Sequence, residues 1–439
     1  MKRYDMVETE LPGQGVVFWP VGTGDSTTIV VGDNLVMQVD LRDMKAADED
    51  DAVVAAVIDR LEETLPRPDG TTPYLAVFAL THADSDHCCG FGDLLESSIL
   101  IGEIWATPRL WRELSEDKPM CEDAQRFQDE VERRVDATLK AVKDGKEPAS
   151  GDRVRIIGYD EDRELHSYAE LPDEYFTFPG DVITKIDGQD VEDRFEAFVH
   201  APFKDHCAGD RNDTSLALQV QMKASDGTVG RLLFLGDLAY PIIKMIFENS
   251  EAAGNSDRVE WDVLLSPHHC SKKAMYAEGE DGKEELKQDL LDLLQAHASP
   301  DARVIASSLP FREKDEKGNN PPHLLARDAY ASITDYEVLC TGEYPSKEEP
   351  RPVVFALEPG LGLELVDVAD LENKVRMLEA AGGGRQLLAA LGVSRYPAAA
   401  FAAGAGLPHP RGTEAARAGV QQARGDKAEP AVQIGFGAA

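Results

Sequence analysis

The sequence predicts an α/β fold that carries a charged helical insertion. Short apolar and β-branched runs alternate with segments of helical periodicity along most of the 439 residues. Several of these runs end directly in Asp or His, which puts metal-ligand side chains at strand ends. From about residue 108 to 195 the chain is instead charged and weakly periodic, with too little apolar content for a core of its own. We therefore expect one large domain over residues 12–365, with an insertion or lid at about 108–195.

Apolar runs mark the strands of the first half, and a Gly32-Asp33-Asn34 turn signal joins the second to the third. The expected strands are Val16–Trp19, Thr27–Val31, Leu35–Val39, Tyr74–Leu80 and Ile101–Thr107. Apolar residues at helical spacing predict helices, and these are Ala52–Leu65, Phe91–Leu100 and Glu122–Val142. The chain therefore opens as a sheet with helices between its later strands.

The second half continues this alternation. The expected strands are Phe195–His200, Ser215–Met222, Arg231–Leu235, Val263–Ser266, Val304–Ser307, Tyr336–Cys340 and Val353–Leu357, and the expected helices are Pro241–Phe247 and Glu284–His297. After about residue 370, two short helical segments (371–381 and 385–391) precede an Ala/Gly/Pro-rich stretch with almost no large aliphatic residues. Residues 370–439 are slightly basic, and we expect a flexible tail there.

The formal net charge is −36. It favours solubility and opposes tight, unaided binding of duplex DNA, because nucleic-acid affinity comes largely from Lys and Arg. A generally acidic proteome would explain the charge equally well. No apolar run reaches the roughly 20 residues of a membrane helix, and no apolar stretch follows the basic Lys2 and Arg3, so no export signal is predicted. Six scattered cysteines do not form a disulfide framework, and we expect reduced thiols in the cytoplasm.

The densest set of potential ligands follows the strand that ends at Leu80. His82, Asp84, Asp86 and His87 lie within six positions. Successive strand residues point to opposite faces, so only a loop at the strand end can bring all four to one point. Imidazole and carboxylate groups suit zinc, manganese or iron rather than calcium. The alternative is a polar loop with two ordinary surface histidines, but such a cluster after a buried strand is costly unless it binds something.

Two later strands end in similar residues. One is followed by Gly236-Asp237, and another leads into the pair His268-His269. Taken singly, a strand that ends in Gly-Asp is usually a turn, and a histidine pair is as often structural as functional. Their order along the chain is more informative. A ligand cluster, a strand ending in Asp and a strand ending in His would build one metal-facing edge from several strands.

These residues in this order resemble the metallo-β-lactamase superfamily of metal-dependent hydrolases, which implies a four-layer αββα sandwich. The usual pattern is His-x-His-x-Asp-His, and Asp84 here replaces the second histidine, as in the hydrolase domain of ComEC-type DNA-uptake competence proteins and their stand-alone relatives. Further stretches similar to that subgroup are Val21-Gly22-Thr23-Gly24-Asp25, Asn212-Asp213-Thr214-Ser215, Gly236-Asp237, His268-His269-Cys270-Ser271 and a late His323.

The resemblance extends from about residue 15 to 358, apart from the insertion, and it has departures. Cys270 replaces a usual Gly, and Cys88-Cys89 precede Gly90 where a second Gly is usual, so the loop shape stays open. The membrane channel and the oligonucleotide-binding domain of the full competence proteins have no counterpart in the sequence. DNA uptake is therefore not implied.

The resemblance implies two divalent ions, zinc or manganese, that together activate water for hydrolysis. The expected metal ligands are His82, Asp84, Asp86, His87, Asp237 and His268. Asp237 would bridge the two ions, and His268 would complete the side formed by Asp86 and His87. The carboxylate of Asp84 makes the site harder, which favours manganese over zinc without excluding zinc.

The expected catalytic residues are Asp86, Asn212, Ser215, His269 and His323. Asn212 and Ser215 would contact a substrate oxyanion, and the two histidines would donate protons or bind phosphate. Ser215 could instead be only the first residue of a strand. Asp25 would orient a ligand histidine, or only accept backbone hydrogen bonds in its turn. His200 or His206 would be a third metal histidine, or a surface residue.

The subgroup resemblance favours a phosphodiesterase or nuclease. Its substrate would be a short oligonucleotide, a cyclic nucleotide or a phosphorylated metabolite, unless a basic partner protein presents the nucleic acid. The wider superfamily also hydrolyses esters, amides and lactams. A different possibility is a non-catalytic module, in which the metal stabilises the fold while the insertion and the tail bind a partner protein. The complete ligand set favours an enzyme.

Overall fold

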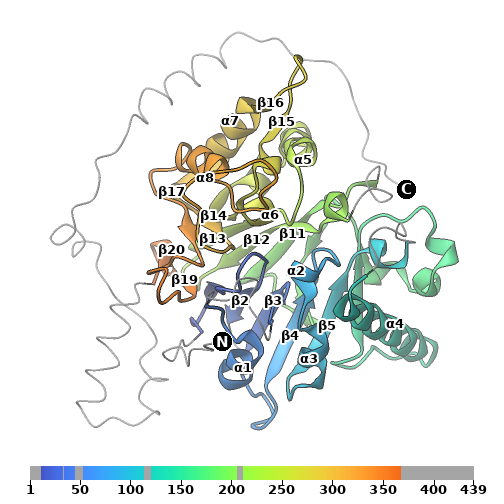
Figure 1. The fold of residues 1–439 in the computed structure, drawn as a ribbon. Helices are drawn as coiled ribbons and strands as arrows, with labels where there is room; N and C mark the ends of the chain where they lie inside the picture. Colours follow the sequence, from blue (N-terminus) through green and yellow to red (C-terminus); the bar gives the residue numbers. More distant parts are fainter. Residues whose placement is uncertain (1–10, 33, 45–52, 113–119, 205–210, 367–439) are drawn as a thin grey trace, which may run out of the picture. The chain divides into compact units, whose positions relative to one another are not determined.

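The computed structural model describes residues 11–32, 34–44, 53–112, 120–204 and 211–366 (Figure 1). Within these ranges the chain is a mixed α/β structure built on a nine-stranded and a seven-stranded sheet, with two small separate hairpins. The expected tail at 370–439, with its two short helical segments, and His206 lie outside the described residues.

The first sheet has the strand order β20-β19-β1-β2-β3-β4-β5-β6-β7. Its strands β3 to β7 run parallel to one another, and the others pair antiparallel. The bounds are β1 Gly15–Phe18, β2 Thr27–Gly32, β3 Leu35–Val39, β4 Tyr74–Ala79, β5 Leu100–Ala106, β6 Arg153–Ile157, β7 Phe176–Thr177, β19 Val353–Glu358 and β20 Gly362–Leu365.

The second sheet has the order β18-β17-β14-β13-β12-β11-β8. Here β13, β14, β17 and β18 are parallel. The bounds are β8 Val182–Ile183, β11 Phe195–Ala201, β12 Ala217–Lys223, β13 Val229–Phe234, β14 Trp261–Leu265, β17 Ala298–Ala306 and β18 Leu339–Cys340. The two small hairpins pair β9 (Lys185–Ile186) with β10 (Gln189–Asp190) and β15 (Tyr276–Glu278) with β16 (Glu284–Leu286).

The helices are α1 Val57–Thr64, α2 Ser85–Cys88, α3 Phe91–Glu96, α4 Glu122–Lys143, α5 Tyr240–Ala252, α6 Pro267–Cys270, α7 Gln288–His297 and α8 Leu324–Ala331. None of the helices in the described ranges has both the length and the apolar character needed to cross a bilayer.

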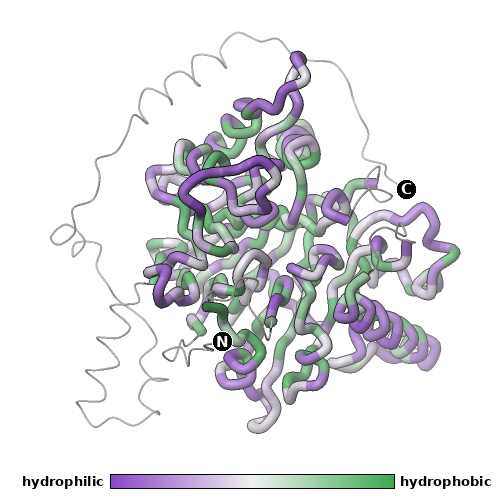
Figure 2. Tube along the Cα trace, in the orientation of Figure 1, coloured by the Kyte–Doolittle hydropathy of each residue, from purple (hydrophilic) through white to green (hydrophobic). Residues whose placement is uncertain are grey.

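Three apolar clusters arrange these elements in four layers. Alternate residues of β1 show the principle: Val16 faces the cluster between the two sheets, and Val17 faces the cluster beneath α1, α3 and α4. A third cluster joins the outer face of the second sheet to α5, α7 and α8. Figure 2 shows the strands mostly in green and the outer loops and the β15–β16 hairpin in purple. The expected α/β fold is confirmed as a helix–sheet–sheet–helix sandwich.

The segment expected to be an insertion or lid is built into this sandwich. Between residues 108 and 195 the chain supplies β6 and β7 to the first sheet and β8 to the second. Phe127, Val131 and Val135 of α4 are fully buried in the first cluster. The apolar residues are sparse because only one stripe of α4 faces the sheet. The segment therefore packs into the same hydrophobic core as the rest of the sandwich. That it is an insertion relative to other proteins stays a prediction.

Two helix predictions need correction. The helix expected from Ala52 begins only at Val57. The single helix expected over Glu284–His297 is in fact β16 followed by α7, because Glu284–Leu286 pairs antiparallel with Tyr276–Glu278. Pairing with a distant segment overrides the local helical pattern there. The remaining expected strands and helices within the described residues are present with boundary shifts of up to six residues.

Candidate metal centre

The loops that carry the potential ligands follow strands whose carboxyl ends meet between the two sheets. The cluster at 82–87 follows β4, Asp237 follows β13, and the His268-His269 pair follows β14. Backbone hydrogen bonds join these loops: Leu216 N donates to Thr81 O over 2.9 Å, and His268 N donates to Gly236 O over 3.0 Å. Parallel strands bring such loops to one edge of their sheet, and the two sheets bring two such edges together.

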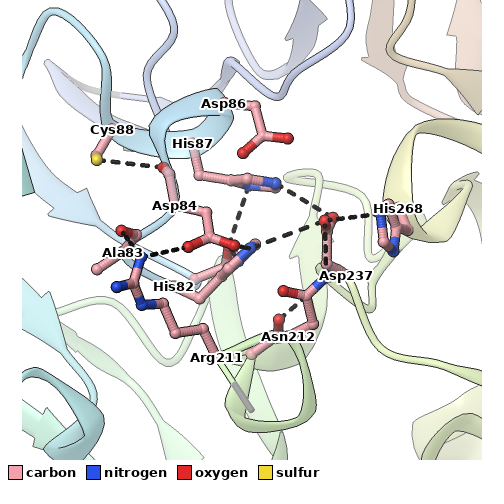
Figure 3. A network of polar contacts seen from close by, with 12 residues as sticks. His82, Ala83, Asp84, Asp86, His87, Cys88, Arg211, Asn212, Asp237 and His268 are labelled. Atoms are coloured by element: carbon pink, nitrogen blue, oxygen red, sulfur yellow. Dashed lines mark hydrogen bonds and ion pairs between the residues drawn. The ribbon is translucent and has the colours of Figure 1, made fainter. Parts of the chain in front are cut away.

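Asp237 joins the ligands of the site: in Figure 3 it contacts His82 and His87 on one side and His268 on the other. Its Oδ2 lies 3.8 Å from His82 Nε2 and 3.6 Å from His268 Nε2. Asp84 Oδ2 lies 3.9 Å from the same His82 nitrogen. We call His82, Asp84, His268 and Asp237 Oδ2 the first donor set.

The second donor set comprises Asp86, His87, His269 and Asp237 Oδ1. This oxygen lies 3.2 Å from His87 Nε2 and 3.7 Å from His269 Nε2. Asp86 Oδ2 lies 3.2 Å from the same His269 nitrogen. Ligand atoms around a tetrahedral zinc with bonds of about 2.0–2.1 Å are about 3.3 Å apart. The second donor set therefore has the spacing of a metal site, and the first is a few tenths of an ångström wider.

Several buried polar atoms of this site lack a hydrogen bond within the described part of the chain. They are Asp25 Oδ1, His82 Nε2, His87 Nε2, Asp237 Oδ1 and His269 Nδ1. Such orphaned atoms are costly and call for a missing partner. Asp25, His87, Asp237 and His269 also offer ligand atoms within 4.8 Å of one another. The residues present thus fit a divalent metal ion.

His268 and His269 exchange the positions expected from the sequence. His268 was predicted on the side of Asp86 and His87, but its imidazole faces the Asp237 oxygen next to His82. His269 takes the place beside Asp86 and His87. The cause is backbone conformation: His268, His269 and Cys270 have φ values of 53°, 55° and 63°. This left-handed turn costs energy for non-glycine residues, and it aims the two imidazoles at opposite sides of Asp237.

Carboxylates behind the imidazoles fix their orientation. His87 Nδ1 donates to Asp40 Oδ2 over 2.7 Å, which leaves Nε2 free to face Asp237. Thr81 holds the Asp40 carboxylate through its backbone N–H and its hydroxyl, each at 2.7 Å. Asp25 Oδ1 lies 3.3 Å from His269 Nδ1, as a charged neighbour and not as a hydrogen-bond acceptor. The sequence analysis missed Asp40, although it ends a strand in the same way as the ligands do.

Arg211 is a second functional candidate that the sequence analysis missed. Its guanidinium Nη1 lies 2.7 Å from Asp84 Oδ1, and its side chain is almost completely buried. It therefore puts a fixed positive charge on the outer oxygen of a candidate ligand while Oδ2 faces His82. Arg211 lies outside the recognised motifs. The one sequence feature that could have indicated it is its position directly before Asn212.

The residues expected to bind a substrate oxyanion lie beside Asp237. Ser215 Oγ accepts from Asp237 N over 3.2 Å and is fully buried, so it positions the Asp237 backbone. A Cβ at Gly236 would come within 2.6 Å of the Ser215 side chain, and the φ of 51° also favours glycine. Asn212 Nδ2 lies 3.5 Å from Asp237 Oδ2, and Asn212 is only half-buried. Asn212 can therefore face a bound substrate, whereas Ser215 cannot.

Two other histidines are engaged elsewhere in the structure. His323 Nδ1 accepts from Lys272 N over 3.3 Å and its Nε2 donates to Asn319 O over 3.2 Å. His200 Nε2 donates to Arg258 O over 2.8 Å, and burial lowers the pKa of its imidazole to about 4. A substrate role for His323 and a metal role for His200 thus receive no geometric support.

The protonation of the site reflects its excess of carboxylates. Burial alone would lower the pKa of His87, but Asp237 and Asp40 hold it well above the ordinary value. Burial likewise disfavours the charged form of His269, and Asp237 and Asp25 raise its pKa to about 10. Burial would raise the pKa of Asp237, but the facing His87 and His269 hold it well below the usual range. The buried carboxylates thus require positive charge between them, which protons or a metal ion can supply.

Comparisons with known proteins add little. No protein-family model matches the chain, and no curated protein matches it. Among solved structures, the chain is similar to the metallo-β-lactamase MIM-1 from Novosphingobium pentaromativorans, with 13% sequence identity over 66% of this chain and 88% of that chain and a TM-score of 0.28. At that score the likeness does not bear on function. The described residues themselves form an α/β sandwich with a buried Asp/His cluster that fits a divalent metal ion.

Proposed function

We propose that this protein is a metal-dependent hydrolase of the metallo-β-lactamase fold that cleaves phosphodiesters, as a phosphodiesterase or nuclease. The observation that carries the proposal is the pair of donor sets on the two oxygens of Asp237. A carboxylate flanked on both sides by imidazoles and further carboxylates is suited to bridge two divalent ions. The resemblance of the His82-x-Asp84-x-Asp86-His87 pattern to a subgroup of that superfamily favours phosphodiesters within the hydrolases.

The first donor set would hold one ion and the second donor set the other. When bound, such an ion pair polarises the scissile bond and lowers the pKa of a water molecule. The protein's own contribution is to hold the donors rigidly. Asp40 fixes the ring of His87 by a hydrogen bond, and Asp25 places a negative charge 3.3 Å from His269 Nδ1. Because both carboxylates are buried, these contacts are not weakened by solvent.

Arg211 and Asn212 support an anionic substrate. Both belong to the segment that follows the undescribed residues 205–210 and lie against the first donor set. Arg211 offsets the charge of Asp84, which reduces the repulsion that a phosphate group would meet. The half-exposed amide of Asn212 can donate a hydrogen bond to a non-bridging oxygen. An uncharged ester or lactam would not be repelled by the Asp84 carboxylate, so the positive charge of Arg211 favours an anionic substrate.

The test combines metal analysis with substrate choice. Full-length protein is loaded with manganese or zinc, its metal content is measured, and it is assayed on bis-p-nitrophenyl phosphate, single-stranded DNA and a β-lactam. We expect up to two ions per chain and cleavage of at least one phosphodiester. Asp237→Asn should lose both metal and turnover. His297→Gln, which changes the last residue of α7 and its pairing with Glu251 of α5, should keep both.

The other outcomes would each contradict part of the proposal. Cleavage of the β-lactam alone would move the protein to the amide hydrolases. Two bound ions without any turnover would favour a non-catalytic, metal-stabilised module. Absence of bound metal in the wild type would refute the site itself. His268→Ala and His269→Ala should each remove one ion, because their imidazoles belong to different donor sets.

A further inference from the structure

Two cysteines form a close pair directly behind the candidate metal centre. The sulfur atoms of Cys88 and Cys121 lie 3.6 Å apart, although the residues are 33 positions apart in the chain. Both are free thiols. Cys88 immediately follows His87 at the end of α2, and Cys121 caps the amino end of α4. The pair therefore connects the segment that carries Asp86 and His87 to the longest helix of the described chain.

The backbones on both sides of the pair are held in place. The Asp123 carboxylate in the first turn of α4 accepts from Gly90 N over 3.0 Å and from Gly92 N over 2.8 Å. Asp43 N also donates to Cys89 O over 2.8 Å, which holds the loop on its other side. The two sulfurs lie 3.6 Å apart, and forming the disulfide bond of about 2.05 Å shortens that distance by about 1.5 Å.

The two thiols have different surroundings. Cys88 is fully buried, and its Sγ donates to the Asp84 carbonyl oxygen over 3.2 Å. Cys121 is partly exposed, and its Sγ accepts from Ala124 N over 3.4 Å. A sulfur that accepts a backbone N–H at a helix amino terminus is stabilised as thiolate, which is the nucleophilic form.

We propose that Cys88 and Cys121 are a redox-active dithiol that hydroperoxides oxidise to a disulfide, with Cys121 as the attacking thiol and Cys88 as the resolving thiol. Accessibility selects Cys121 for the first step, because a peroxide must reach the sulfur. Proximity selects Cys88 for the second. The inference does not depend on the proposed hydrolase activity.

The chemistry balances with hydrogen peroxide as the oxidant. The Cys121 thiolate attacks one peroxide oxygen, the O–O bond breaks, and the departing hydroxide takes a proton to become water. Cys121 is now a sulfenic acid, oxidised by two electrons. The Cys88 sulfur then attacks the Cys121 sulfur, the S–O bond breaks, and the leaving hydroxide takes the Cys88 proton. Two thiols and one peroxide thus give one disulfide and two waters.

The pKa of Cys121 agrees with its role as the attacking thiol. The contact with Cys88 and the hydrogen bond from the Ala124 N–H together outweigh burial and lower the pKa of Cys121 to about 6. Cys89 provides a matched comparison, because it is a half-buried free thiol in the same loop.

The test follows the thiols of the reduced, full-length protein during titration with hydrogen peroxide. Free thiols are counted with a chromogenic disulfide, and peptides alkylated without reduction are mapped by mass spectrometry. We expect the loss of two thiols per chain. Mass spectrometry should show a disulfide between the peptide with Cys88 and the peptide with Cys121, two hydrogen atoms lighter than the two reduced peptides together. Cys121→Ser should slow the loss of thiols about tenfold. Cys88→Ser should instead accumulate a sulfenic acid on Cys121 that dimedone traps.

The control is Cys89→Ser, which should behave like the wild type. The proposal is overturned if the first oxidised residue is Cys89 or Cys207, if Cys121→Ser loses its thiols as fast as the wild type, or if the disulfide joins other cysteines. Metal content, measured on the same samples before oxidation, reports separately on the proposed metal site.

Discussion

Asp40→Asn is the sharpest perturbation of the candidate metal centre, because it changes no ligand. Asp40 accepts from His87 Nδ1, Thr81 Oγ1 and Thr81 N, all at 2.7 Å. An asparagine has one oxygen and one NH₂ group. If the NH₂ faces Thr81 N, two donors oppose each other. If it faces His87, Nδ1 must become an acceptor, and the proton moves to Nε2, the nitrogen that faces Asp237.

In both orientations His87 loses its negatively charged partner, so metal binding weakens. Loss of a buried partner of a ligand histidine typically costs about 10- to 100-fold in metal affinity, or about 1.4–2.8 kcal/mol. We expect the second donor set to carry this loss, because His87 belongs to it. The first donor set should lose less affinity, because Asp40 reaches it only through the Thr81 hydroxyl, 3.1 Å from His82 Nδ1.

The assay is competition for manganese or zinc between the protein and a chromogenic chelator, with thermal unfolding of the metal-free protein alongside. Asp187→Asn is the matched control. Asp187 is also buried and accepts from Tyr74 OH and Ser150 Oγ, but it lies in a separate network with Arg153. The Asp187→Asn variant should be less stable than the wild type but should bind the metal ions equally well. If Asp40→Asn binds two ions as tightly as the wild type, the assignment of His87 as a ligand through Nε2 is wrong.

Three further predictions concern the whole fold. Chelation of the metal should lower the melting temperature by several degrees, since an ion present at a hundred times its Kd stabilises the folded chain by about 2.7 kcal/mol; an unchanged melting temperature would contradict metal binding to the folded state. His200→Gln should reduce acid sensitivity. The unfolded chain protonates His200 near its ordinary pKa of 6.5 and the folded chain only at about 4, so the wild type loses about 3 kcal/mol as the pH falls through that window, and the glutamine variant should not; denaturant unfolding at pH 7 and pH 4.5 measures the difference. Gly24→Ala should lower the free energy of unfolding by about 1–3 kcal/mol, because its Cβ would lie 2.4 Å from Arg42 Cδ and 2.6 Å from the Asp86 carbonyl oxygen. Urea unfolding should show the lower stability, and a metal assay should show weaker binding because Asp86 belongs to the second donor set.

The sequence by itself determined where the potential ligands lie along the chain. Apolar runs identify strands because a buried strand needs apolar side chains, and polar residues directly after such a run must lie at a sheet edge. This local logic located His82, Asp237 and the histidine pair, and the structure brings them within a few ångströms of one another. The strand pattern was equally local, which is why most element boundaries were predicted to within a few residues.

The tertiary structure alone decided how these residues share their roles. The exchange of His268 and His269 depends on a left-handed backbone turn that residue types do not encode. Asp40 and Arg211 became visible only when distant segments met, since each acts through a ligand on another loop. The buried stripe of α4 and the strand at Glu284–Leu286 likewise depend on partners far along the chain. Side-chain chemistry is a local property, whereas orientation and pairing are set by contacts between segments that the sequence lists far apart.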